Sequence, residues 1–124
     1  MGKLEKDLFH SIKQRLNLYQ MTGECEWWGR LNSLKVKTIY GGIVQGLPKG
    51  TPDILALIRN RQEGLTALFL ELKSDTGKLR KEQIEFRERY HRLAGFVFME
   101  IREVKELDFW IEKNAKDFVC GITL

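Results

Sequence analysis

Two acidic residues and one lysine form the most informative pattern in this sequence of 124 residues. Asp53 follows Pro52, and Glu71 is followed by Leu72 and Lys73. Each acid lies at the end of an apolar run, so two adjacent β-strands would bring the carboxylates together. Carboxylates held close together repel unless a cation lies between them, and a divalent cation beside a lysine suits hydrolysis of a phosphodiester.

The link between the two apolar runs predicts how they pair. Residues 54–58 and 65–70 are largely apolar, as expected of central strands covered on both faces. The polar residues 59–64 between them predict a hairpin turn, and a hairpin centred there places Asp53 opposite Glu71, roughly 5 Å apart at their side-chain origins. Lys73 then projects from the same sheet face. The alternative is a strand-entry aspartate beside a surface ion pair.

A second amphipathic helix is expected over residues 78–94, ended by Gly95. Its inward stripe consists of Leu79, Phe86, Tyr90 and Leu93. Gln83 fills the gap in that stripe and therefore faces inward, where a buried amide needs hydrogen-bond partners. A short turn separates Lys73 from this helix, so Gln83 can reach back to the charged residues. It is equally compatible with a polar residue at the edge of the core.

Residues 3–20 predict a first amphipathic helix. Its apolar positions are Leu8, Phe9, Ile12, Leu16 and Tyr19. Glu5 shares this apolar face, whereas Asp7 does not. Glu5 is thus a candidate for the charged site, although an acid near a helix N-terminus is also simply a favourable partner of the helix dipole.

The positive charge of the chain is concentrated in one segment. The net charge is +4, and residues 27–52 contain no Asp or Glu while Arg30, Lys35, Lys37 and Lys49 supply four positive charges. Clustered positive charge favours a polyanionic partner, most simply nucleic acid. A solvated loop that merely lacks acids would give the same pattern.

The remaining pattern indicates one α/β domain spanning residues 1–124, with the element order αβββαβ. The other expected elements are one or two strands within 25–40, a flexible glycine-rich stretch over 41–50, a strand over 96–101, a helix over 103–115 and a short strand over 118–120.

The composition excludes several other classes of protein. Apolar residues make up 43% and charged residues 31%, with no membrane-spanning run and no apolar signal core. Cys25 and Cys120 lack metal or disulfide spacing and suggest a reduced, cytoplasmic protein. His10 and His91 are isolated, which argues against a zinc site.

These motifs together resemble the PD-(D/E)XK nuclease superfamily and, more narrowly, its virus-type replication–repair nuclease (VRR-NUC) domain. The segments that carry the resemblance are residues 50–54, 69–74, 77–79 and 83–86, with a looser likeness of residues 28–32 to an aromatic-Arg-x-Asn segment of that family. The resemblance is firm over about residues 46–101. It implies a restriction-endonuclease-like fold in which a mixed central sheet is flanked by helices.

The resemblance also implies a site and an activity. Asp53, Glu71 and the Leu72 carbonyl would bind Mg²⁺ or Mn²⁺, with Glu5 as a further candidate ligand. Lys73 would act on the attacking water, and Gln83 matches a glutamine that follows the catalytic strand. DNA-binding candidates are Arg30, Asn32, Lys35, Lys37, Lys49 and Lys78.

Family members that stand alone at this size resemble junction resolvases, which act as symmetric dimers. By analogy, the resemblance implies a homodimeric, structure-selective endonuclease of replication, recombination or repair, in a bacterium or a phage-infected cell. Holliday junctions and flaps are the expected substrates. The alternatives are a nucleic-acid-binding module without catalysis and a restriction-type nuclease with sequence specificity.

Overall fold

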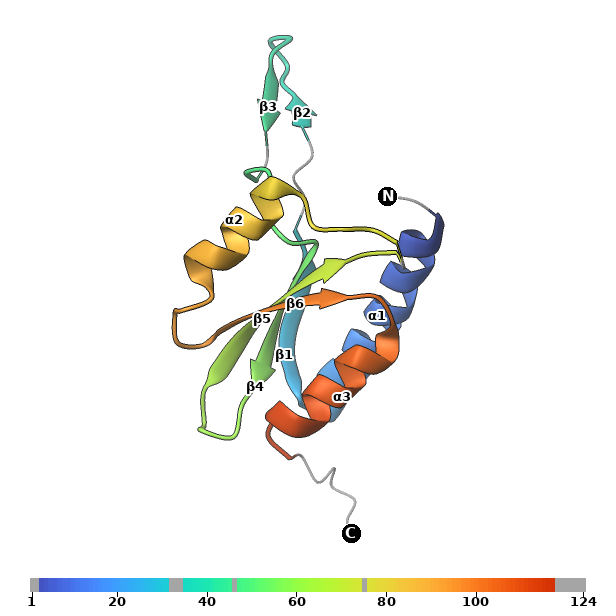
Figure 1. Ribbon diagram of the computed structural model, residues 1–124, viewed down its shortest axis with the longest axis vertical. Coiled ribbons are helices and arrows are strands. Elements are labelled where there is room, and N and C mark those ends of the chain that lie inside the picture. The colour runs from blue at the N-terminus through green and yellow to red at the C-terminus, as the bar shows by residue number, and fades with distance from the viewer. Residues whose placement is uncertain (1–2, 32–34, 46, 75, 118–124) are drawn as a thin grey trace.

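The computed structural model describes residues 3–31, 35–45, 47–74 and 76–117, and shows an α/β protein (Figure 1). Its elements in chain order are α1 (Lys3–Thr22), β1 (Cys25–Arg30), β2 (Lys35–Lys37), β3 (Ile43–Gln45), β4 (Ile54–Arg59), β5 (Leu65–Leu72), α2 (Lys81–Tyr90), β6 (Phe96–Ile101) and α3 (Val104–Asn114). The expected order αβββαβ is therefore confirmed for α1, β1, β4, β5, α2 and β6. The strand expected at residues 118–120 lies outside the described residues.

The main sheet is mixed and has the strand order β1-β4-β5-β6. β1 and β5 both run antiparallel to β4, whereas β6 runs parallel to β5. Parallel neighbours need a crossover connection, and α2 provides it. The two strands that carry the acidic motif are thus the two central strands of the sheet.

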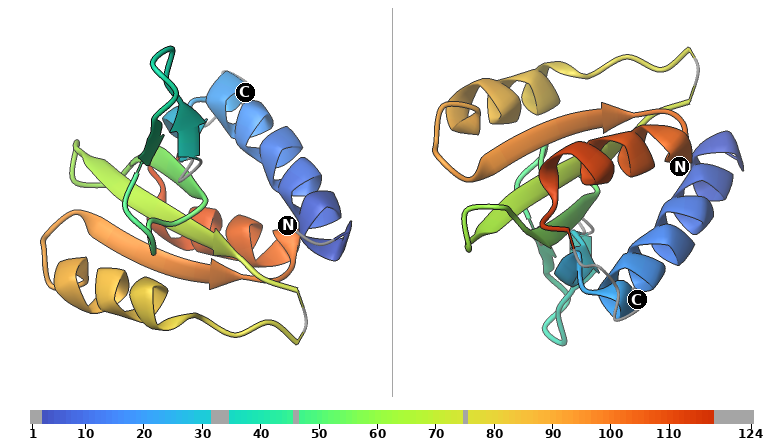
Figure 2. Two further views of the ribbon diagram at one scale, coloured as in Figure 1. Left: turned by 90° about the horizontal axis from the view of Figure 1, so that it is seen from above. Right: turned by 90° about the horizontal axis from the view of Figure 1, so that it is seen from below.

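Helices cover both faces of this sheet, with α2 on one face and α1 and α3 on the other (Figures 1 and 2). Alternate residues of the central strands are buried toward α1 and α3, among them Ile54, Ala56 and Leu70. The opposite residues pack beneath α2, where the rings of Phe69 and Phe86 lie 5.4 Å apart in an edge-to-face arrangement. The expectation that both faces of these strands are covered is confirmed.

The second helix is shorter than its sequence pattern predicts. Arg80 has an extended backbone and donates its N–H to the Gln83 side chain over 2.7 Å, so the first helical residue is Lys81. At the other end the residues after Tyr90 form turns that lead to Gly95, which has a φ of 84°. Leu93 is consequently exposed and does not belong to the inward stripe.

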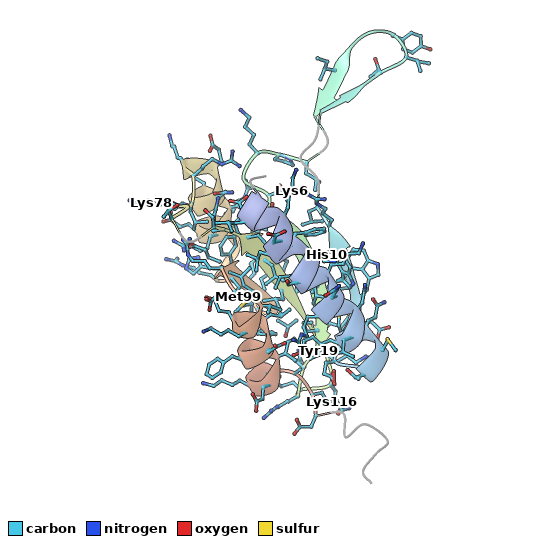
Figure 3. All side chains as sticks on the ribbon, turned by 90° about the vertical axis from the view of Figure 1, so that its right-hand side faces the viewer. Lys6, His10, Tyr19, Lys78, Met99 and Lys116 are labelled. Carbon is cyan, nitrogen blue, oxygen red and sulfur yellow. The ribbon has the colours of Figure 1, made fainter. Side chains whose placement is uncertain are left out.

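A second departure concerns residues 41–50, which were expected to be a flexible stretch. Part of this stretch is β3, which pairs with β2 in a separate two-stranded hairpin. Thr38 closes its turn, because its N–H donates to the Gly42 carbonyl and its Oγ1 accepts from the Gly42 N–H. The hairpin stands clear of the main body in Figures 1 and 3. None of the helices in the described part of the chain is long and apolar enough to cross a membrane.

Candidate active site

The strand register brings the two acidic residues together as the turn predicted. Ile54 pairs with Leu70, and every following pair of β4 and β5 keeps the register in which Asp53 lies opposite Glu71. Asp53 stands just before β4, and its Oδ2 accepts the Leu72 N–H over 2.8 Å. The carboxylate of Asp53 is therefore anchored to the end of β5, next to Glu71.

Lys73 joins the two acids at this end of the sheet. Its Nζ lies 3.8 Å from Glu71 Oε1, and both side chains are nearly inaccessible to solvent, with 11% and 3% exposed. Its backbone N–H donates to the Ile101 carbonyl of β6 over 3.0 Å, which continues the parallel ladder past the end of β5. The ion pair is thus a buried one, rather than the surface pair that the sequence left open.

Gln83 reaches the same carboxylate from α2. Its Nε2 donates to Glu71 Oε1, while its Oε1 accepts the Arg80 N–H, so the orientation of the amide is fixed at both ends. Gln83 is buried, which confirms that it faces inward. Because it belongs to the first turn of α2, the positive end of that helix dipole lies close to Glu71.

The second oxygen of Glu71 is left without a partner. Within the described residues, Oε2 is the buried side-chain oxygen or nitrogen that makes no hydrogen bond. The pKa of Glu71 is raised to about 8, chiefly by burial and then by the charge of Asp53, against the opposing charges of Lys73 and Arg80. Burial also raises the pKa of Asp53. A bound water or a cation would supply the partner that this buried oxygen lacks, and a cation would also favour the ionised form of both carboxyl groups.

The donors fit a hard divalent cation such as Mg²⁺ or Mn²⁺. The carboxylates of Asp53 and Glu71 supply oxygen ligands, and the Leu72 carbonyl belongs to the residue that follows Glu71. No three His, Cys, Asp or Glu side chains in the described ranges gather closely enough to hold a metal ion by themselves. Two carboxylates would therefore be completed by a backbone carbonyl and water, as is usual for Mg²⁺.

Glu5 lies at the edge of this site. Its charge is close enough to raise the pKa of both Asp53 and Glu71, so the N-terminal turn of α1 does approach the acidic pair. The side chain is half-buried, yet it is not the third member of a closed ligand group. The role of Glu5 as a direct ligand stays a prediction.

The predicted DNA-binding residues are distributed around the site. Arg30 ends β1, its charge favours the ionised form of Asp53, and its guanidinium lies 4.4 Å from the centre of the Phe9 ring. Lys49 and Lys78 are exposed, and Figure 3 shows Lys78 at the outer edge of the molecule. Lys35 and Lys37 lie in β2, although their side chains are outside the described part, as is all of Asn32.

Arg102 is a residue that the sequence pattern did not single out. Its guanidinium donates to the Ser74 carbonyl, to the Gly77 carbonyl over 2.7 Å and to the Glu100 carboxylate. It thereby braces the loop that follows Lys73. The parallel pairing of Leu72 with Ile101 places Arg102 beside that loop. The register of β5 and β6 is therefore the signal that would have identified Arg102.

Gly50 fixes the segment that carries Asp53 against α2. It is buried with a φ of 90°, and a Cβ at this position would overlap the Glu82 carbonyl oxygen. Glu82 precedes Gln83, so one glycine contact positions both the loop of Asp53 and the helix turn that contacts Glu71. This explains in physical terms why the sequence has glycine three residues before Asp53.

Gly50→Ala should lower the free energy of unfolding by about 2–4 kcal/mol, because it combines a disfavoured backbone conformation with steric overlap. Gly95→Ala is the matched control, since Gly95 has a φ of 84° and its added Cβ would come no closer than 3.8 Å to the Leu65 carbonyl oxygen. That variant should lose only about 1–2 kcal/mol. Urea unfolding of both variants measures the difference, and equal losses would contradict the proposed packing.

The raised pKa of Glu71 predicts how stability depends on pH. In the metal-free protein the free energy of unfolding should fall as pH rises from about 4.5 to about 8. In this window the folded state keeps a proton on Glu71 that the unfolded chain has released, so each increase in pH favours the unfolded chain. Urea unfolding with EDTA at pH 5, 6.5 and 8 measures the slope. Glu71→Gln should flatten it, and an unchanged slope would rule out Glu71 as its source.

Comparison of the chain with models of known protein families, with curated proteins and with solved structures finds no match. The functional conclusion therefore depends on the residues and geometry of the site.

Proposed function

We propose that this protein is a metal-dependent DNA endonuclease that hydrolyses phosphodiester bonds. The observation that carries the proposal is the buried Glu71 carboxylate, which has an unsatisfied Oε2, lies opposite Asp53 and pairs with Lys73. Placing two carboxylates of raised pKa side by side at one end of the sheet does not stabilise the folded state of the metal-free protein. The arrangement is accounted for by a cation that the site is built to hold.

Each group has a distinct task in the proposed reaction. Mg²⁺ or Mn²⁺ bound by Asp53, Glu71 and the Leu72 carbonyl would neutralise charge on the scissile phosphate. The Lys73 ammonium, 3.8 Å from Glu71 Oε1, orients the attacking water and stabilises the negative charge that develops during attack. Gln83 holds Glu71 in the geometry that its ligand role needs.

The basic residues near the site support DNA as the proposed substrate. Residues 27–52 contain no acid, and this segment leads directly to Asp53. Contacts of this kind with the phosphate backbone bind DNA without reading its sequence, which favours selection by DNA structure. We therefore propose branched DNA, such as a flap or a Holliday junction, as the substrate in replication, recombination or repair.

Membership of the VRR-NUC group of PD-(D/E)XK nucleases is part of this proposal. It is supported by the motifs at Asp53 and at Glu71–Lys73 and by the αβββαβ order of the main sheet and its helices. A homodimer would place two sites on opposite strands of a junction. The cytoplasm of a bacterium or of a phage-infected cell is the proposed compartment.

The proposal is tested by incubating the protein with labelled linear duplex, single-stranded, flap and four-way-junction DNA in Mg²⁺ or Mn²⁺. We expect cleavage that requires the metal, stops with EDTA and is fastest on branched DNA. Binding of all these forms without cleavage in either metal would identify a DNA-binding module instead. Cuts at fixed sequences on linear duplex would identify a restriction-type nuclease.

A further inference from the structure

The β2–β3 hairpin, called the arm below, has no role in the proposed chemistry of the site. Its strands pair only with each other within the described residues, so it adds no strand to the main sheet. A two-stranded hairpin is marginally stable in isolation, and an arm that contributes nothing to the core needs another reason to exist.

The tip of this arm presents large apolar side chains to solvent. Ile39 and Tyr40 are each 91% exposed and Ile43 is 70% exposed, all within or beside one turn. Gly41 has a φ of 83°, and no atom lies within 4 Å of where its Cβ would be. Single exposed apolar residues are ordinary on a surface, whereas several together at a projecting tip indicate a binding surface.

The arm is joined to the candidate active site at both of its ends. Before the hairpin, the Leu31 N–H donates to the Asp53 carbonyl over 2.7 Å. After it, residues 47–52 run directly into Asp53, and within this segment the Thr51 hydroxyl donates to the Pro48 carbonyl over 2.7 Å. A ligand that occupies the site between Asp53 and Glu71 is therefore adjacent to the base of this arm.

The charge of the arm indicates which kind of ligand could contact both the arm and the site at Asp53 and Glu71. The arm and its flanks belong to residues 27–52, which contain four basic residues and no acid. The basic sequence of this segment suits a ligand with negative charge, and the apolar tip suits a ligand with flat apolar surfaces. Nucleic acid has both, because its phosphates are charged and every base has an apolar face on which aromatic side chains stack.

Stacked duplex bases are not available to such a tip without unstacking, which costs a few kilocalories per mole for each step. Bases at a flap, a junction or a single strand are already exposed. The strand Lys35–Lys37 and the turn that follows it carry the tip away from the main body (Figure 1).

We infer that the tip formed by Ile39, Tyr40 and Ile43 stacks on unpaired bases of the DNA that is cut, and so selects branched over linear DNA. The inference rests on the proposed nuclease function. It names the part of the chain that recognises DNA structure, whereas Asp53, Glu71 and Lys73 act at the phosphate.

The test compares the double variant Ile39→Ser/Tyr40→Ser with the wild type and with Met21→Ser. Met21 is the matched control, because it is an apolar residue 85% exposed on the last turns of α1. Flap and linear duplex cleavage are measured in Mg²⁺. We expect the double variant to lose flap cleavage about tenfold to a hundredfold, with linear cleavage unchanged and Met21→Ser equal to wild type.

A second measurement detects stacking without cleavage. Flap DNA carrying 2-aminopurine at each of the five unpaired positions nearest the branch is mixed with protein in Ca²⁺, which occupies hard oxygen sites and is expected not to support hydrolysis. Stacking changes the fluorescence of a 2-aminopurine probe. The wild type should change it at one or two positions, and the double variant at none.

The outcomes separate the two proposals. If the wild type cuts no DNA with either metal, the nuclease function is wrong and the inference falls with it. If the double variant keeps the branch preference, or loses flap and linear cleavage equally, the tip is not the selecting element and the nuclease function stands. A double variant that loses only self-association, with the preference intact, would assign the tip to a second copy and overturn the inference. Thermal unfolding of each variant confirms that the fold is retained.

Discussion

Asp53→Asn is expected to lower metal-dependent cleavage by about a thousandfold, equivalent to about 4 kcal/mol of transition-state stabilisation. Asparagine preserves the size of the side chain and its acceptor oxygen, which the Leu72 N–H contacts at 2.8 Å. It removes the negative charge that the proposed metal ligand at Asp53 would need. The measurement is the single-turnover rate on the DNA form that the wild type cuts fastest, over a range of Mg²⁺ concentrations.

Glu63→Gln controls for the loss of an acid from the same hairpin. Glu63 lies in the turn at the far end of β4 and β5, where it pairs with Lys116 at 2.9 Å. This variant should cut within about twofold of the wild type, because an exposed ion pair contributes at most about 1 kcal/mol to stability and nothing to the site. Unimpaired cleavage by Asp53→Asn would show that the metal is bound elsewhere.

Asp53→Asn should also make the metal-free protein more stable at pH 8, because it removes the charge of Asp53 from beside the buried Glu71 carboxylate. Mg²⁺ or Mn²⁺ should raise the melting temperature of the wild type, since a ligand that binds only the folded state stabilises it. It should not raise that of Asp53→Asn. This readout is independent of DNA and of catalysis.

Lys73→Met is the second large effect, with an expected loss of about a hundredfold to ten-thousandfold in cleavage rate. Methionine keeps the apolar stem that fills this buried position but lacks the ammonium 3.8 Å from Glu71 Oε1. The cleavage rate at saturating metal measures the loss. The rise in melting temperature on adding Mg²⁺ should persist, because the carboxylates remain.

Lys73→Arg distinguishes a chemical role of Lys73 from a structural one. It keeps the positive charge but not the compact ammonium geometry, and so should recover stability more completely than activity. Equal recovery of both would indicate that Lys73 serves only to hold Glu71 in place. A loss of the metal-induced melting shift in Lys73→Met would contradict the separation of tasks within the site.

Much of the candidate site could be predicted because it depends on local sequence relations. The register between Asp53 and Glu71 follows from the turn between two apolar runs, and the inward face of Gln83 follows from helical periodicity. Lys73 shares the face of Glu71 because strand residues alternate. Each of these relations involves residues in one hairpin or one helix, where spacing in the chain determines spacing in the fold.

The features that the sequence did not predict depend on backbone contacts and turn geometry. Arg102 donates to the backbone carbonyls of Ser74 and Gly77. Every residue has a backbone carbonyl, so the residue types at these positions do not indicate the contact. The sequence predicts strands within residues 25–40, where β2 lies, but not β3, because Gly41 and Gly42 in the turn between them indicate a flexible stretch. The late start of α2 depends on the Gln83 side chain accepting from Arg80, a contact that overrides the apolar periodicity before Lys81.

The bond between the Leu31 N–H and the Asp53 carbonyl has a consequence for how this protein can change. It closes the body of the fold at the point where the chain departs into the β2–β3 hairpin and returns from it. Closing a longer or shorter loop at such a point changes the free energy by only about 0.6 kcal/mol per doubling of length. Exchange of the hairpin residues 35–45 alone, with Gly50 kept, would therefore leave β1, β4 and the carboxylates of Asp53 and Glu71 in place. If the tip selects the DNA as inferred, exchange of this hairpin would change the DNA preference and leave the chemistry at Asp53 and Glu71 unchanged.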